Sequence, residues 1–366
     1  MKWQDFFIGV EDFRVEGRCD HLLSDILMLT LIGVICDCDD FEQIADYGRD
    51  NEVFLKTFLE LPNGIPSHDT LNRVFRYLDS EQVLNCLHQW SSSLVSFLSG
   101  KHIAIDGKEL RGTIPEGKKH ATIRIVSAWV REDGVSLSQQ VVDSKSNEIT
   151  AIPKLLGTID ISGSVVTIDA IGCQRAIAEL IVSKSADYVL SLKKNQGDLY
   201  EQVSSYFLHN EAGLSCFEER DLGHGRAELR KTYVCNELKF MEETQNWEGL
   251  KAVFMVKRYR WKADKKQEQI QFYISSLVKP STKDAAKYAR GHWSIENNCH
   301  WQLDITFNED ASTLRKDNAP ANLAVIRKFA LTLLKNQTTK ISLARKRKKA
   351  NRNNTFLVNI LSKLKN

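Results

Sequence analysis

The sequence is informative first for what it lacks. None of its apolar runs approaches the roughly 18 residues that suggest a membrane-spanning helix, and its first residues lack the pattern of a secretory signal peptide. Its eight cysteines are scattered without a CxxC pair, which disfavours a structural zinc site, and a disulfide framework is not expected in a chain this long. These absences predict a cytoplasmic protein with reduced cysteines and no membrane partner.

What is present is ordinary in amount but uneven in distribution. With 366 residues, of which 42% are hydrophobic and 27% charged, the chain is expected to form more than one globular domain. Residues 1–100 contain 7 Lys and Arg against 17 Asp and Glu, whereas residues 335–366 contain 10 Lys and Arg and no acid. The basic C-terminal tail, 336–366, favours a polyanionic partner, although a solvated, frayed terminus is the alternative.

Residues 1–95 have the apolar spacing of helices and are predicted to form a small all-α N-terminal domain. One helix is expected from about Asp69, capped by Ser67 or by Asp69 itself. It could belong to a helix-turn-helix that presents Asn72, Arg73 and Arg76 to DNA. The acidity of the region favours the other interpretation, an ordinary helical packing domain.

From about residue 101 the pattern changes to strands, which indicates an α/β domain over 96–335 with a mixed sheet. A helix is expected to start at Ala151, with Pro153 in its first turn. A β-rich insertion is predicted over about 200–280, followed by a helix that contains Glu296. The strands are expected at 102–106, 123–130, 135–142, 164–169, 187–192, 232–235, 252–258 and 269–274, and further helices at 174–185 and 322–334.

Three carboxylates stand at informative places in this pattern. Asp106 and Asp169 each end a short apolar run, on the side of an α/β sheet where sites are usually formed. Glu296 lies in a predicted helix with His292 and His300 four residues before and after it, so all three share one face. Two magnesium ions held by such carboxylates can support phosphoryl transfer. The sequence therefore predicts a two-metal site.

Each of these signals alone has a plainer interpretation. An aspartate after an apolar run often caps a turn, and the stripe from His292 to Asp304 could be a solvated helix face. A metal site made of His292, Glu296 and His300 is also geometrically possible, but the spacing is not the HExxH of a zinc protease. The order of strand carboxylate, strand carboxylate and helical glutamate favours a ribonuclease-H-like nuclease fold.

Polar and basic residues around these acids are candidates for DNA contacts, which would position a backbone without reading its sequence. Trp293 and Trp301 could stack on an unpaired base, but packing of the helix onto the core is the preferred interpretation. The candidate DNA-contacting residues are Lys108, Arg111, Lys193, Asn195, Gln196, His224, Arg226, Arg290, His292, His300 and Arg315.

At this point the sequence resembles a known family, the H-repeat-associated, ISAs-type insertion-sequence transposases of the DDE class. The resemblance runs over essentially the whole chain. It is carried by Gly64–Thr70, Asp106-Gly-Lys108, residues 143–153, Thr167–Gln174, residues 187–196, His224-Gly-Arg226 and residues 292–310.

The resemblance implies a ribonuclease-H-like core with Asp106, Asp169 and Glu296 as catalytic and metal-binding residues. It implies two Mg²⁺ ions, which Mn²⁺ could replace, and double-stranded DNA partners, namely the terminal repeats and the target. It also implies a homodimer in the DNA complex and a place on the bacterial nucleoid.

In the wider superfamily a Tyr and an Arg precede the glutamate and a Lys follows it. Here those positions are Ala289, His292 and Leu303, so His292, His300 and Arg315 are nominated for the terminal phosphate. Two further functions stay open: a catalytically inactive DNA-binding relic or regulator, and a nuclease or repair enzyme of the same fold.

Overall fold

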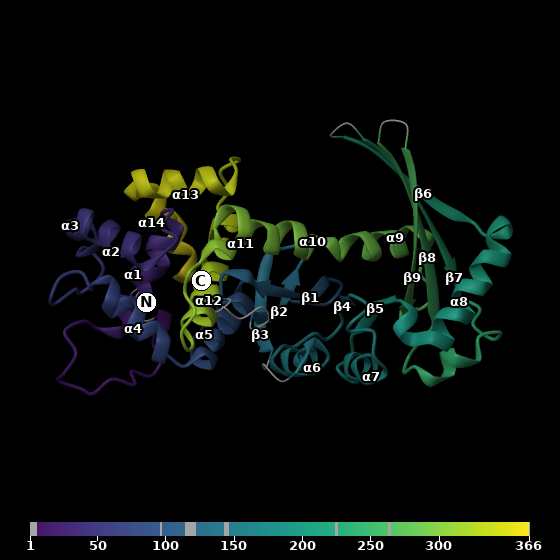
Figure 1. The fold of residues 1–366 in the computed structure, drawn as a ribbon, viewed down its shortest axis with the longest axis horizontal. Helices are drawn as coiled ribbons and strands as arrows, with labels where there is room; N and C mark the ends of the chain where they lie inside the picture. The colour runs from purple at the N-terminus through teal and green to yellow at the C-terminus, as the bar shows by residue number, and fades with distance from the viewer. Residues whose placement is uncertain are drawn as a thin grey trace.

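The computed structural model describes residues 6–95, 97–113, 122–142, 146–223, 226–262 and 265–365. Helices from both ends of the chain lie together at one end of the molecule, a sheet occupies the middle, and long hairpins form the other end (Figure 1). Among the described residues, no helix is long and apolar enough to cross a membrane. The eight cysteines are all free, and six of them are buried.

Helices from the two ends of the chain share one hydrophobic core. Side chains of α1 such as Ile26 and Leu29 are fully buried, and α1 packs against α12. The expected capping residue of α4 is Ser67, whose hydroxyl accepts the N–H of Thr70 at 3.2 Å. These helices are α1 (Leu23–Ile35), α2 (Phe41–Asp50), α3 (Glu52–Leu55), α4 (His68–Tyr77), α5 (Ser80–Leu94), α12 (Ala319–Asn336), α13 (Leu343–Arg352) and α14 (Asn354–Leu361).

The residues expected to form a basic tail are folded. Helix α14 buries Phe356, Leu357 and Ile360 in the core that it shares with α1 and α12. Within α13, Arg347 is 1% exposed in its side chain and its guanidinium donates to the carbonyl oxygens of Val34 and Cys38. The alternative interpretation of a solvated, frayed terminus is wrong, because these residues form helices and two of the cations, Lys346 and Arg347, are buried.

Nine strands form a single sheet in the order β3-β2-β1-β4-β5-β9-β8-β7-β6. Strands β1, β4 and β5 are parallel, and the remaining neighbours are antiparallel. The strands are β1 (His102–Leu110), β2 (Ile123–Val130), β3 (Val135–Val142), β4 (Val165–Ile168), β5 (Asp187–Leu192), β6 (Cys216–Gly223), β7 (Arg226–Cys235), β8 (Ala252–Lys262) and β9 (Lys265–Ser275).

The predicted β-rich insertion extends the central sheet, because β9 pairs with β5 from Val189 to Leu192. It contains four strands, one more than the sequence predicted. The missed strand, β6, has the sequence Cys-Phe-Glu-Glu-Arg-Asp-Leu-Gly, in which polar residues dominate and alternation is weak. The insertion therefore belongs to the same rigid sheet as the strands that carry the aspartates.

Successive side chains of β1 point to opposite faces of the sheet. Ile103 and Ile105 are buried in the core beneath α6 (Glu148–Thr158), α7 (Arg175–Ser183) and α8 (Gly197–Asn210). Ala104 belongs to the core on the other face, together with side chains of α10 (Trp293–Ile295), α11 (Trp301–Thr306) and α12. By the same alternation Asp106 and Lys108 face α10 and α11, and Gly107 faces α6. Helix α6 begins at Glu148, so Pro153 lies inside it and not in its first turn.

The glutamate segment runs across the second face as a nearly continuous row of helices (Figure 1). The row consists of α9 (Thr282–Gly291), α10 (Trp293–Ile295), a π-helical turn (Glu296–His300) and α11 (Trp301–Thr306). Gly291 allows close approach to β1, because a Cβ there would lie 2.6 Å from the His102 ring. The sequence predicted one regular helix here, whereas the structure contains a π-helical turn within the row.

Candidate active site

The two aspartates come together because their strands are parallel neighbours. Ile105 of β1 pairs with Ile168 of β4, so Asp106 and Asp169 stand one step further along adjacent strands. Asp169 immediately follows β4, and its carboxylate accepts the backbone N–H groups of Ile171 at 3.1 Å and Gly172 at 3.4 Å. These hydrogen bonds fix the orientation of the Asp169 carboxylate at the C-terminal end of β4.

Glu296 reaches the same place from the π-helical turn. A cavity of about 720 Å³ is lined by Asp106, Asp169 and Glu296, together with Lys193, Lys194, His292 and Trp293. The three predicted carboxylates therefore share one cavity although 190 positions separate the first from the last.

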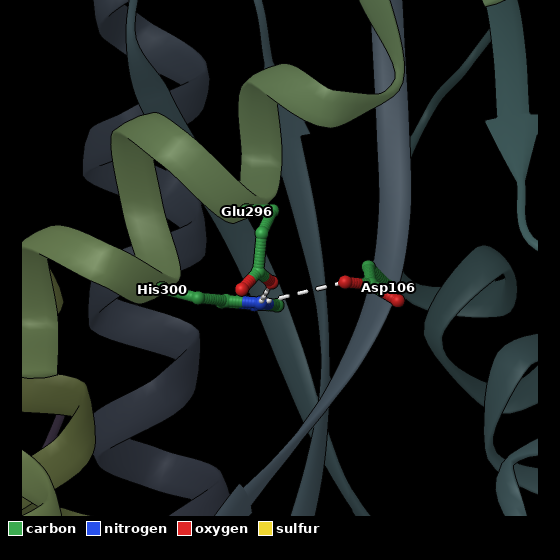
Figure 2. Close-up of side chains that lie close together, drawn as sticks. All are labelled: Asp106, Glu296 and His300. Atoms are coloured by element: carbon green, nitrogen blue, oxygen red, sulfur yellow. Dashed lines mark hydrogen bonds and ion pairs between the residues drawn. The ribbon is translucent and has the colours of Figure 1, made fainter. Parts of the chain in front are cut away.

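His300 is buried between two of these carboxylates, as Figure 2 shows. Its Nδ1 lies 3.3 Å from a carboxylate oxygen of Glu296 and 3.5 Å from one of Asp106. Burial alone would lower the pKa of His300, but the hydrogen bonds to Asp106 and Glu296 raise it above its ordinary value. The same bond to His300 lowers the pKa of Glu296. Protonation of the ring, which these two carboxylates favour, places a positive charge between the acids.

The donor atoms of this group fit a divalent cation. Asp106, Glu296 and His300 each offer one ligand atom, and the three atoms lie within 4.8 Å of one another. Carboxylate oxygens suit Mg²⁺ or Mn²⁺, and an imidazole nitrogen suits Mn²⁺ better than Mg²⁺. The histidine that was expected on the same face, His292, takes no part in this group.

Asp169 completes the negative charge of the cavity. Burial is the first cause that raises its pKa, and the neighbouring charge of Asp106 is the second. Mutual repulsion of this kind is relieved when a cation binds between carboxylates. The repulsion between Asp106 and Asp169 therefore favours the binding of a cation in this cavity.

His292 has a different role from the one that the helical spacing suggested. Its Nδ1 lies 3.1 Å from the hydroxyl of Thr167, which in turn lies 2.7 Å from Nε2 of His102. Burial lowers the pKa of His292. The residue therefore links α10 to β4 and β1, and its burial favours the neutral form of the ring.

One functional group was missed from the sequence. Glu148, the first residue of α6, lies against Gly107, where a Cβ would come within 2.4 Å of its carboxylate. Burial and the charges of Asp169 and Asp106 raise the pKa of Glu148. It approaches β1 from the face opposite Asp106, so it adds negative charge from beneath the site. The sequence feature that could have identified Glu148 is its position directly after Asn147, the N-cap of α6.

Lys108 was expected to contact DNA, but its side chain is only 10% exposed. Its ammonium group donates to the carboxylates of Asp304 and Glu309. This ion-pair network holds α11 and the following turn onto β1, which is a structural position.

The side-chain amides of Asn195 and Gln196 are also engaged within the protein, although Asn195 is exposed. The Asn195 amide donates to the carbonyl oxygen of Ala170 at 2.9 Å, and the Gln196 amide donates to that of Cys173 at 2.8 Å. They brace the loop that follows Asp169. Their lysine neighbour Lys193 is exposed and lines the cavity.

The remaining candidates lie on the surface or outside the described residues. Arg111 is 76% exposed and lies 3.8 Å from Asp310, and Arg315 is exposed, with its Nε donating to the carbonyl oxygen of Gly112. Arg290 pairs with Glu219 and Asp221 on β6. His224 lies outside the described residues, and of Arg226 only the backbone is described, at the start of β7.

The sequence favoured packing of the two tryptophans onto the core, but in the structure they are exposed. Trp293 and Trp301 are each 51% exposed. Trp293 lines the cavity of the three carboxylates.

Comparison with known proteins places this geometry in a family. The transposase DDE domain matches residues 98–333, and the DDE_Tnp_1-associated domain matches residues 4–91. "Putative transposase YncI" of Escherichia coli O157:H7 is 38% identical, over 98% of this chain and 94% of that protein. "H repeat-associated putative transposase YhhI" of Escherichia coli K12 is 35% identical, over 96% of each chain.

Among solved structures, a piggyBac transposase synaptic complex with hairpin DNA is similar with a TM-score of 0.45 and 12% identity. The match covers 99% of this chain and 77% of that one.

Proposed function

Since the chain belongs to the family of transposase DDE domains, we propose that it is an active DNA transposase. It cuts DNA at the ends of an insertion sequence and joins those ends to a target. The observation that carries the proposal is the single cavity that contains Asp106, Asp169 and Glu296. The strand order β3-β2-β1-β4-β5, with β1, β4 and β5 parallel, supports a ribonuclease-H-like core.

In this proposal Asp106, Asp169 and Glu296 hold two Mg²⁺ ions, which Mn²⁺ can replace. Bound metal ions supply Lewis acidity to the attacked phosphodiester and stabilise charge on the leaving oxygen. Nδ1 of His300 would serve as a further ligand beside Asp106 and Glu296, and it would have to be unprotonated to do so. Thr167 and His292 keep α10 in register with β4, which orients Glu296.

Four exposed basic residues are proposed to contact the DNA backbone: Lys193, which lines the cavity of the three carboxylates, and Arg111, Arg290 and Arg315. His224 and Arg226 remain proposals from the resemblance. Lys108, Asn195 and Gln196 bond to other groups of the protein, and we assign them positioning roles.

We further propose a helical N-terminal domain over 1–95 and a catalytic domain over 96–335. The protein acts as a homodimer on paired DNA ends, at the nucleoid of a bacterial cytoplasm. The family matches at 4–91 and 98–333 support the boundary.

The alternative, a catalytically inactive DNA-binding relic, is disfavoured because all three acids line one cavity. The deciding experiment is a Mg²⁺- or Mn²⁺-dependent cleavage and joining assay on DNA that carries the gene's own flanking sequence. Asp169→Asn is the matched control, since an Asn oxygen can still accept the N–H groups of Ile171 and Gly172. We expect joined products from the natural protein and none from the variant.

Binding to the flanks without cleavage would assign the protein to the relic or regulator class. Cleavage that leaves free ends and no joined product would assign it to the nucleases. Cleavage by the variant at the natural rate would remove Asp169 from the catalytic set.

A further inference from the structure

A second cavity lies beside the first on the same face of the sheet. It has a volume of about 550 Å³, and Gln271, Tyr273 and Trp293 line both cavities. One wall comes from strands β6 to β9, and the other from α9, α10 and the π-helical turn. Asn297, which directly follows Glu296, is among the lining residues. Whatever occupies this cavity is therefore close to the proposed metal ligands.

The second cavity is dominated by arginine. Five arginines line it, namely Arg131, Arg230, Arg258, Arg260 and Arg290. The carboxylates in the same place are Glu219 and Asp221 on its wall and the buried Glu228 behind it. The cluster thus contains two more cations than anions, and this excess favours an anionic ligand.

Three of the arginines are held in fixed positions by Glu228. The side chain of Glu228 is 3% exposed, and its Oε1 accepts from Arg258 at 2.8 Å and from Arg260 at 3.0 Å. Arg230 donates to the same carboxylate through Nη2. Its Nη1 is buried and has no hydrogen-bond partner among the described residues. The guanidinium groups are therefore preorganised, and at least one keeps a buried donor free.

We propose that this arginine cavity binds a backbone phosphate of the DNA strand whose neighbouring phosphodiester lies among Asp106, Asp169 and Glu296. The planar guanidinium fork matches the oxygens of a phosphate. The wall shared at Trp293 lets one strand pass from one cavity to the other. The inference rests on the proposed function. It adds a site that holds one phosphate of the strand beside the phosphodiester that reacts.

The test is DNA binding by the full-length protein as a function of salt, measured by fluorescence anisotropy on a labelled random-sequence duplex in EDTA. A duplex of any sequence is suitable because phosphate contacts carry no sequence information. Arg260→Gln on β8 and Arg131→Gln in the turn after β2 each remove one cation from the cavity. We expect each to weaken binding roughly tenfold at fixed salt and to reduce the slope of log K against log salt by about 0.9.

Arg220→Gln is the matched control. Arg220 is 79% exposed and lies next to Glu219 on β6, so its side chain points to the opposite face of the sheet. Its variant is expected to keep the natural slope. Arg131→Gln leaves the three arginines around Glu228 in place. If Arg260→Gln lowers the Tm, the salt dependence of Arg131→Gln alone tests whether the cavity binds phosphate.

Natural slopes in both cavity variants, or an equal loss in Arg220→Gln, would overturn the proposal. DNA cleavage by the natural protein together with such unchanged slopes would reject the arginine site and leave the transposase function standing. Reduced slopes in a protein that cuts no DNA would support the arginine site and reject the transposase function. The rise of Tm with Mn²⁺ should be the same in Arg131→Gln as in the natural protein, because the carboxylate site is untouched.

Discussion

Nδ1 of His300 lies 3.3 Å from the carboxylate of Glu296, four residues earlier in the π-helical turn. The same ring atom lies 3.5 Å from Asp106 on β1. One side chain, 3% exposed, therefore joins the helix that carries the third acid to the strand that carries the first.

The charge of His300 predicts a pH-dependent stability of the metal-free protein. The folded pKa is raised above the ordinary value of 6.5, so the stabilisation is fully present below about pH 6.5 and is lost as pH rises through the folded pKa. The Tm difference between the natural protein and His300→Gln in EDTA should shrink across that window. A difference that is constant from pH 5 to 9, measured by circular dichroism, would contradict this role.

Asp169→Asn is expected to make the metal-free protein more stable at neutral pH. The folded pKa of Asp169 is raised by burial and by Asp106, so ionisation costs stability as pH rises above its ordinary value of 3.8. Removing the charge should raise Tm by about 1–2 °C. The same variant should lose most of the Tm increase that Mn²⁺ gives to the natural protein. A lower Tm in EDTA would refute the prediction.

Gly107→Ala should destabilise the protein by about 1–3 kcal/mol, because its Cβ would lie 2.4 Å from the Glu148 carboxylate. Truncation of that neighbour should relieve the clash, so Gly107→Ala/Glu148→Ala should be more stable than the sum of the single variants predicts. Gly157→Ala in α6 is the control, since a Cβ there meets nothing within 4 Å. Urea unfolding compares the natural protein with the two single variants, the double variant and the control, and strict additivity would contradict the contact.

Lys108→Ala should cost about 3–5 kcal/mol, the usual effect of leaving a buried charge unpaired. The exposed charge lost in Arg111→Ala should cost less than about 0.5 kcal/mol. Side-chain exposures of 10% for Lys108 and 76% for Arg111 set the contrast. Denaturant unfolding gives the values. If Lys108→Ala kept full stability and lost DNA affinity instead, the residue would return to the DNA-contacting set.

The sequence contained most of what positions the three acids. The bounds expected for β2, β3 and β5 are those observed, because apolar residues recur along each strand and the turn at Asp133-Gly134 separates β2 from β3. The aspartates could be predicted to meet since strand ends on one edge of a parallel sheet are neighbours. Glu296 was identified through its spacing from two histidines, although only His300 contacts it.

What could not be predicted depends on contacts between distant segments. The same spacing made His292 and His300 equivalent in the sequence, but Thr167 binds the first and Asp106 the second. Lys108 follows Asp106 by two positions and looked like a phosphate contact. Only the fold brings Glu309, which is 2% exposed, to its ammonium group. Glu148 was overlooked because its approach to the site depends on the missing Cβ of Gly107.

The core shared by the two ends of the chain sets an order of events during synthesis. Side chains of α1 such as Ile26 and Leu29 pack in one core with those of α12 and with Leu357 and Ile360 of α14. Helix α1 is synthesised before α12 and α14, so its apolar side chains stay exposed until those helices have been made. A nascent chain that stops before α12 leaves the apolar side chains of α1 without these partners and is therefore prone to aggregate.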